Sequence, residues 1–201
     1  MTKDVNKLTA VAKNAHKVVK AWRNKSKDWY PLPNNVDVAL FAVTEAAEAI
    51  DAYLRKNASY KRSNVKNNNV QLELGDLLFM LLSFDGYVPF SSTNGGMVPS
   101  EIHIATFEAL STRRKLSTIS LSVTWIAQAF VMAGDSQLPN ESVMQLVSTM
   151  IDSTILAILS CGNFDISYLY GTLKKIEMKH KPQTSGDKLQ LKLSYTTGET
   201  I

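Results

Sequence analysis

Two apolar stretches of this chain each carry a pair of acidic residues three positions apart, and this pattern constrains the fold more than any other feature. Glu45 and Glu48 stand among Ala, Val and Ile residues, and Glu73 and Asp76 stand among Leu, Phe and Met residues. Residues three apart project from neighbouring turns on one face of an α-helix. Each stretch therefore predicts a helix that packs in the interior but presents two carboxylates on one face.

Carboxylates that lie this close repel one another unless a cation neutralises them. Two such helices packed antiparallel bring all four carboxylates together. Oxygen ligands of this kind suit Mg²⁺, with Mn²⁺ as the alternative, because these cations prefer carboxylates to thiols or imidazoles. His16, His103 and His180 are isolated and form no metal-ligand or catalytic-triad spacing. The candidate metal ligands and catalytic residues are therefore the four acids Glu45, Glu48, Glu73 and Asp76.

The composition of the chain favours helices. A chain of 201 residues with 45% hydrophobic content can bury a full core, and only six Pro and nine Gly residues interrupt it. The helical spacing of its apolar residues predicts an all-α bundle of about six helices. The expected helices cover residues 6–24, 36–56, 70–84, 101–133 with a break near 112–115, 141–160 and 165–180.

Charge and hydropathy predict a cytoplasmic protein that binds neither nucleic acid nor membrane. The formal net charge of +4 is mild, and the basic residues are scattered, whereas a nucleic-acid-binding surface clusters them. The polar start lacks the apolar segment of a signal peptide, and no apolar run long enough to span a bilayer is free of polar residues. Cys161, the only cysteine, has no partner for an internal disulfide.

A weak internal repeat relates the two halves of the chain. Residues 43–50 align with residues 123–130 at an offset of 80 positions, with Val, Thr and Ala in the same register. At an offset of 76 positions, Asp76 aligns with Asp152, which lies in a similarly apolar run. The repeat predicts a tandem pseudo-dimer of two helical units.

The second unit lacks most of the acidic residues. Trp125 stands at the position of Glu45, and Gln128 stands at the position of Glu48. Neither an indole nor a neutral amide holds Mg²⁺ well, so we expect one working site, with Asp152 as a relic or a local hydrogen-bond partner. The predicted regions are a catalytic half (1–100), a degenerate half that supplies core and pocket walls (101–182) and a C-terminal tail (183–201). Association of two such chains into a homodimer is left open.

The acidic motifs, taken in order, resemble those of a known family. Glu45-x-x-Glu48 followed by Glu73-x-x-Asp76 resembles the ExxE and ExxD signature of the all-α nucleoside triphosphate pyrophosphohydrolases, the MazG-like and dimeric dUTPase/dCTPase superfamily. The resemblance covers about residues 6–85. It implies an all-α bundle in which these four acids bind Mg²⁺, and an enzyme that splits an NTP or dNTP into the monophosphate and pyrophosphate.

Five further residues are candidate substrate contacts. Trp29 lies in an aromatic and Pro-containing loop, where its ring can stack on a base or fold onto the helix ends. Lys56, Lys61 and Arg62 follow the first acidic helix, where they can reach the phosphates or stay solvated. Lys175 lies in a segment that resembles the family's closing Lys-x-x-x-Asn segment, although the Asn of that segment is a lysine here.

The leading function is Mg²⁺-dependent nucleotide pyrophosphohydrolysis. The alternative from another class is a catalytically silent MazG-like helical interaction module, against which the presence of all four acids argues. A weak nucleic-acid binder is suggested only by the pI of about 9.1.

Overall fold

The computed structural model describes residues 5–31, 33–57, 69–91, 101–134, 140–161 and 164–181, with the side chains of 101–104 excepted. Within these ranges the chain forms seven α-helices and no β-strand, which confirms the predicted all-α fold. The helices are α1 (Val5–Ser26), α2 (Asn35–Asn57), α3 (Val70–Leu81), α4 (Glu101–Glu108), α5 (Thr112–Ala133), α6 (Glu141–Leu159) and α7 (Ser167–His180). The predicted tail, 183–201, lies outside the described residues.

Several helices begin at polar caps that the sequence supplies. Asn69 and Asn140 each accept a hydrogen bond at 3.0 Å from a backbone N–H in the first turn of α3 and of α6. The helix expected over 101–133 is two helices, because Ser111 caps α5 and separates it from α4. The break therefore lies just before the residues at which the sequence placed it, and α3 ends at Leu81, three residues earlier than expected.

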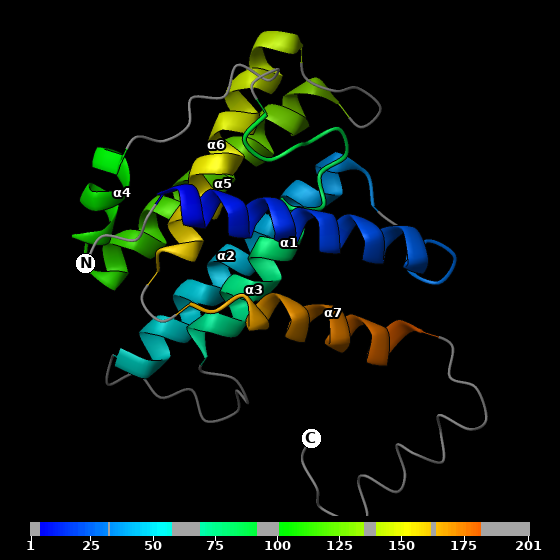
Figure 1. The fold of residues 1–201 in the computed structure, drawn as a ribbon, viewed down its shortest axis with the longest axis horizontal. Coiled ribbons are helices and arrows are strands. Elements are labelled where there is room, and N and C mark those ends of the chain that lie inside the picture. Colours follow the sequence, from blue (N-terminus) through cyan, green and yellow to red (C-terminus); the bar gives the residue numbers. More distant parts are fainter. Residues whose placement is uncertain are drawn as a thin grey trace, which may run out of the picture.

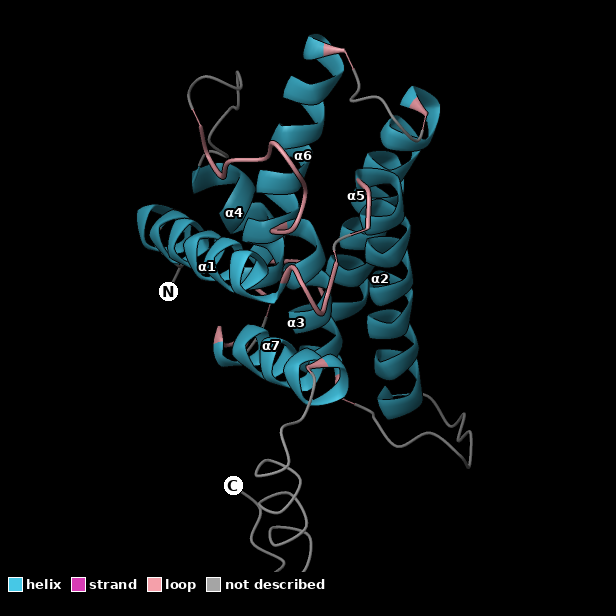
Figure 2. Cartoon of the chain, turned by 90° about the vertical axis from the view of Figure 1, so that its right-hand side faces the viewer, coloured by secondary structure: helices cyan, strands magenta, loops and turns pink. Residues whose placement is uncertain are grey.

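Two antiparallel helix pairs form the centre of the molecule. Figure 1 shows α2 and α3 side by side in opposite directions, and α5 and α6 in the same relation. α2 also packs along α5, which joins the two pairs, while α7 packs on α3 and α1 packs on α6. In the view of Figure 2, α1 and α7 lie on the side opposite α2 and α5. The arrangement encloses α3 between α2, α6 and α7.

The hydrophobic core is continuous through both pairs. Leu74, Leu77 and Leu78 of α3 are fully buried, as expected for a helix that is apolar all round. Beyond α3, the ring of Phe84 stacks on Phe130 of α5 with ring centroids 4.9 Å apart. Because one cluster of buried residues includes side chains from both predicted halves, the division at residue 100 does not separate two cores.

Two helices of the core are notably apolar. Judged by length and composition alone, α5 and α6 are long enough and apolar enough to cross a membrane, with mean hydropathies of 1.5 and 1.6 over 18 residues. Both helices contain polar residues, as the sequence analysis expects of every apolar run of this length. Core helices of soluble proteins meet the same criterion, and both helices contribute buried residues to the core. The cytoplasmic location stays a prediction.

Candidate metal centre

The first acidic pair is carried by a helix whose buried face is made of alanine. Ala42, Ala46 and Ala49 are buried at helical spacing, and their small side chains allow the neighbouring helices to come close. Glu45 stands beside this face and is half-buried, whereas Glu48 is exposed. The pair is thus split between the interior and the surface of α2.

The second pair lies deeper. Glu73 in the first turn of α3 and Asp76 one turn later are each only 7% exposed. Between them, a Cβ added to Gly75 would lie 2.9 Å from the backbone of Tyr168 at the start of α7. The glycine therefore permits the close contact of α3 and α7, and this contact brings side chains of α7 to Asp76.

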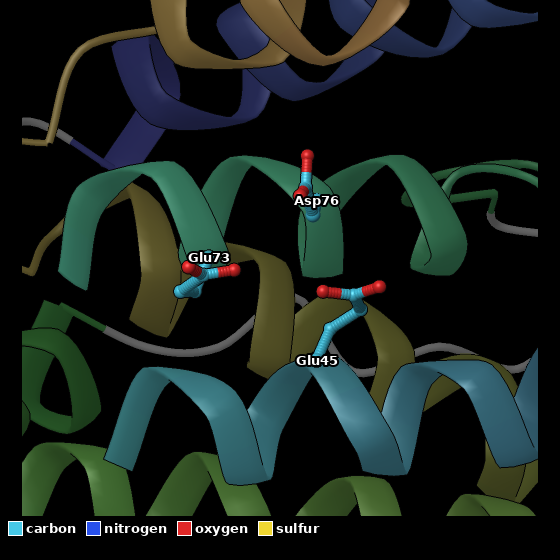
Figure 3. A group of neighbouring side chains, drawn as sticks. All are labelled: Glu45, Glu73 and Asp76. Carbon is cyan, nitrogen blue, oxygen red and sulfur yellow. The ribbon is translucent and has the colours of Figure 1, made fainter. Parts of the chain in front are cut away.

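Three of the four predicted acids meet between α2 and α3. One carboxylate oxygen from each of Glu45, Glu73 and Asp76 lies within 4.8 Å of the other two. In Figure 3, Glu45 points from α2 across to α3, which carries the other two. Glu48 is not part of this group, although its charge acts on Glu45 and Glu73. We call Glu45, Glu73 and Asp76 the acidic cluster.

The environment of the acidic cluster disfavours its negative charge. Burial raises the pKa of Glu45 from its ordinary value of 4.5 to about 7, and the charges of Asp76, Glu48 and Glu73 add to this shift. Burial also raises the pKa of Glu73, again with contributions from Asp76 and Glu48. Desolvation and like-charge repulsion therefore act together, and a bound divalent cation would relieve both.

Asp76 is held by two side chains of α7. The Thr172 hydroxyl donates a hydrogen bond to Oδ1, and the Lys175 ammonium donates one to Oδ2, both at 2.5 Å. Partial burial lowers the pKa of Lys175, but the hydrogen bond to Asp76 and the charges of the acidic cluster outweigh it and raise the pKa. The structure thus brings Lys175, a predicted substrate contact, directly to the acids.

Arg55 is a residue of this site that the sequence reading missed. Its guanidinium pairs with Asp51 at 2.9 Å, and its side chain is only 8% exposed. The Nη1 atom of Arg55 is buried without a hydrogen-bond partner, and the charge of Arg55 lowers the pKa of Glu73. The available signal was the spacing of four between Asp51 and Arg55, which pairs opposite charges on a helix.

Of the other predicted substrate contacts, the structure describes Lys56 and Trp29. Lys56 is exposed in the last turn of α2, and its role stays a prediction. Trp29 is half-buried and packs edge-on against Trp22 of α1 with ring centroids 5.7 Å apart, so its ring folds onto the helix end. Lys61 and Arg62 lie outside the described residues.

A small cavity of about 50 Å³ opens between α2 and α3 beside the acidic cluster. Phe79 lines it one turn after Asp76, and Tyr30 lines it from the loop after α1. Burial raises the pKa of Tyr30, and the charge of Glu45 adds to the shift. The Ser83 hydroxyl also lines the cavity and is buried without a hydrogen-bond partner. The remaining lining residues are Pro33, Val38, Phe41 and Met80.

Comparison of the chain with protein-family models, with curated proteins and with solved structures gives no match. The family resemblance of the two acidic motifs therefore stays a prediction. What supports a function is the chemistry of the acidic cluster and of the groups beside it.

The corresponding region of α5 and α6 is built differently. Trp125 is 61% exposed and lies with Gln128 on an apolar groove of about 370 Å³, so the indole does not fill an interior volume. Asp152 is buried and accepts hydrogen bonds from the Tyr87 hydroxyl and from the Phe90 N–H at 3.1 Å. Burial raises the pKa of Asp152 to about 6 although these hydrogen bonds oppose the shift. Asp152 is thus a local hydrogen-bond partner.

Proposed function

We propose that this protein is a Mg²⁺-dependent nucleotide pyrophosphohydrolase, which converts an NTP or dNTP to the monophosphate and pyrophosphate. The observation that carries the proposal is the meeting of Glu45, Glu73 and Asp76 oxygens within 4.8 Å of one another, from two facing helices. Burying carboxylates together costs free energy unless their charge is compensated. A divalent cation provides that compensation and accounts for the arrangement.

The residues present fit Mg²⁺ by ligand type. The acidic cluster offers only carboxylate oxygens, which are the protein ligands that Mg²⁺ takes while it keeps several waters. Glu45, Glu73 and Asp76 would hold the ion, and Glu48 stands one turn from Glu45 on the exposed side. When bound, the ion supplies charge neutralisation for the phosphates and an activated water for attack on phosphorus.

Two cations beside the acidic cluster are suited to hold the phosphates. The Lys175 side chain is 69% exposed although its ammonium reaches Asp76, so it can exchange a carboxylate for a phosphate oxygen. Arg55 keeps one buried nitrogen free of hydrogen bonds. Ammonium and guanidinium groups form strong charge-assisted hydrogen bonds to phosphate oxygens. We assign Lys175 and Arg55 to the substrate phosphates.

The aromatic side chains near the acidic cluster favour a nucleoside triphosphate over an inorganic polyphosphate, although the cavity of about 50 Å³ that they line is too small to enclose a whole base. Phe79, one turn after Asp76, and Tyr30, whose pKa responds to the charge of Glu45, offer ring surfaces, and the unpartnered Ser83 hydroxyl offers a polar contact. Aromatic walls with a few polar groups are typical of sites for flat organic ligands. An inorganic polyphosphate would leave these surfaces without a role.

The proposal is tested by the identity of the first product. Natural NTPs and dNTPs are incubated one at a time with the full chain and Mg²⁺, and the products are followed by ³¹P NMR. Attack at the α-phosphorus gives the monophosphate and pyrophosphate, and this is the expected result. A nucleoside diphosphate with orthophosphate as the first product would contradict the proposed reaction and require a different site geometry.

The rival function is the catalytically silent helical interaction module. The observation that favours it is the apolar groove of α5 and α6, where Trp125, Met132 and Leu146 are exposed. An activity screen separates the two functions, because a silent module turns over none of the natural or damaged nucleotides when Mg²⁺ is present. Turnover that chelator abolishes excludes it.

The tandem arrangement belongs to the same proposal. The two antiparallel pairs, α2 with α3 and α5 with α6, pack on each other through α2 and α5, as two fused copies of one helical unit would. The first copy then carries the acidic cluster, and the second supplies packing surface. We propose that the enzyme acts in the cytoplasm, as part of nucleotide metabolism.

A further inference from the structure

A second polar pocket lies between α1 and the turn that follows α3. Its volume is about 140 Å³, and no member of the acidic cluster lines it. We call it the α1 pocket. Its lining includes His16, Lys20, Arg23 and Lys27 on the side of α1, and Asp85 and Tyr87 on the side of the turn.

Positive charge is concentrated on one wall of the α1 pocket. Lys20, Arg23 and Lys27 follow one another at spacings of three and four. Lys20 and Arg23 therefore share a face of α1, and Lys27 continues that face in the turn directly after the helix. Asp85 is the only acidic residue of the lining. Like charges at this spacing destabilise a helix, and an anion in the pocket would convert this repulsion into attraction.

Arg23 is the central cation of this wall. It is half-buried, and its guanidinium makes no hydrogen bond or ion pair within the part of the chain that the structure describes. Burial lowers the pKa of Arg23, and the charge of Asp85 opposes this shift without forming an ion pair. A guanidinium carries five N–H donors in a planar fork that matches tetrahedral oxyanions. These donors are therefore available to a ligand of the pocket.

The opposite wall is held in place by contacts to other helices. The backbone N–H of Asp85 donates a hydrogen bond to the Asn35 side chain at 2.8 Å. The buried Tyr87 ring is fixed by its hydroxyl on Asp152 and by the edge of His16, whose ring centroid lies 5.9 Å away. Because this wall is already ordered, a ligand loses little free energy to reorganisation when it binds.

We propose that the α1 pocket binds a phosphate group, carried by inorganic phosphate, by pyrophosphate or by the end of a nucleotide. The Arg23 guanidinium contacts the phosphate through its forked donors, and Lys20 and Lys27 neutralise the remaining charge. The volume of about 140 Å³ accepts one or two phosphate groups but lies below the roughly 300 Å³ of sites that enclose a larger organic ligand. This inference does not depend on the proposed hydrolase activity.

The test is isothermal titration calorimetry of the full chain with sodium phosphate, pyrophosphate and AMP, and with a short single-stranded DNA as a fourth probe. EDTA is present throughout, so that no metal can attach phosphate to the acidic cluster, and NaCl keeps the ionic strength constant. The test variant is Arg23→Gln. The matched control is Lys17→Gln, which removes one charge from an exposed position of α1 that does not line the pocket.

We expect saturable binding of one anion per chain. Arg23→Gln should weaken it at least about tenfold, because charge-assisted guanidinium contacts are among the strongest hydrogen bonds, whereas Lys17→Gln should change it less than about twofold. If Arg23→Gln does not fold, the exposed pair Lys20→Gln/Lys27→Gln takes its place with the same expectation. Tighter binding of pyrophosphate than of AMP assigns the pocket to the inorganic anion, and the reverse order assigns it to a nucleotide.

Three results would overturn the inference. The first is wild-type protein that shows no saturable binding of any of the three anions in EDTA. The second is an equal loss of affinity in Lys17→Gln and Arg23→Gln, which would mean that the anions respond to net charge alone. The third is binding of single-stranded DNA without binding of the small anions.

Discussion

The α2–α3 pair and the α5–α6 pair have the same antiparallel geometry and differ in how they treat a buried aspartate. Asp76 of α3 lies among other acids and is compensated by a cation, Lys175 of α7. Among the described residues Asp152 of α6 belongs to no such acidic group, and it accepts hydrogen bonds from two neutral donors, the Tyr87 hydroxyl and the Phe90 N–H. A metal site requires the first arrangement, because a divalent cation needs oxygen ligands from several side chains, and Asp76 has Glu45 and Glu73 beside it.

The residue before each aspartate shows how the sequence produces this difference. Gly75 lets the backbone of α7 approach α3 and brings Lys175 with it. Ile151, at the corresponding position of α6, fills the core and is 1% exposed. At this position α3 has a glycine, which admits α7 and its lysine, whereas α6 has an isoleucine side chain that fills the core. Because α7 supplies Lys175, it belongs to the acidic site as much as α2 and α3 do.

The largest expected difference between the pairs is in turnover. Asp76→Asn should lower the turnover number about 100-fold or more, because a metal ion contributes several kcal/mol to such reactions. Its matched control, Asp152→Asn, should leave turnover within about threefold of wild type, since this carboxylate only accepts local hydrogen bonds. Pyrophosphate release with saturating Mg²⁺ measures both variants. Asp76→Asn turnover above one-tenth of wild type, or equal losses in the two variants, would remove the distinction.

The second difference is in the pH dependence of stability. The pKa of Asp152 is raised from 3.8 to about 6 by burial, so folding favours the protonated carboxyl. Its contribution to stability is complete below about pH 4 and is lost as the pH rises through about 6, with a total on the order of 3 kcal/mol. Urea unfolding of wild type and Asp152→Asn should show the free-energy difference shifting in favour of wild type between pH 7 and pH 4. A difference that stays constant over this range would show that the hydrogen bonds fully compensate the burial.

A smaller effect is expected from the close contact of α3 with α7. Gly75→Ala should destabilise the fold by about 1–3 kcal/mol, because its Cβ would lie 2.9 Å from rigid backbone of Tyr168. Gly171→Ala on α7 is the matched control: its Cβ would meet no atom within 4 Å, and alanine stabilises a helix by roughly 0.5–1 kcal/mol relative to glycine. Thermal unfolding compares the two, and equal shifts of the midpoint would contradict the account of the contact.

The smallest effect concerns the indole at the position that corresponds to Glu45. Trp125→Ala should change the free energy of unfolding by no more than about 0.5 kcal/mol, since the side chain is 61% exposed. Trp22→Ala should cost about 3–5 kcal/mol, because Trp22 is 8% exposed and packs on Phe79. Chemical denaturation measures both. A large loss from Trp125→Ala would mean that the indole is a core residue after all.

Much of the fold was readable from the sequence because its signals are local. The spacing of apolar residues and caps such as Asn69 and Asn140 predicted the helices within a few residues at most ends. The pairing of the two acidic motifs was also predictable, because antiparallel packing of two short-linked helices brings equivalent faces together. Glu45, Glu73 and Asp76 accordingly meet.

The remaining features depend on contacts between residues far apart in the sequence. Glu48 is exposed because the rotation of α2 about its own axis is set by its packing on both α3 and α5, and periodicity does not determine that rotation. The role of Arg55 depends on the burial of its guanidinium and on its charge acting on Glu73, and the local sequence specifies neither. The exposure of Trp125 likewise follows from where α6 lies along α5, which no local pattern specifies.

If the α2–α3 pair alone holds the divalent cation, titration of Mn²⁺ into wild type, Asp76→Asn and Asp152→Asn will separate the two buried aspartates. The number of bound ions is counted by electron paramagnetic resonance, and thermal unfolding in Mn²⁺ and in EDTA provides the linked stabilisation. The account predicts ion binding and a raised unfolding midpoint in wild type and in Asp152→Asn, and loss of both in Asp76→Asn. Binding that survives in Asp76→Asn but disappears in Asp152→Asn, or no binding by wild type, would contradict it.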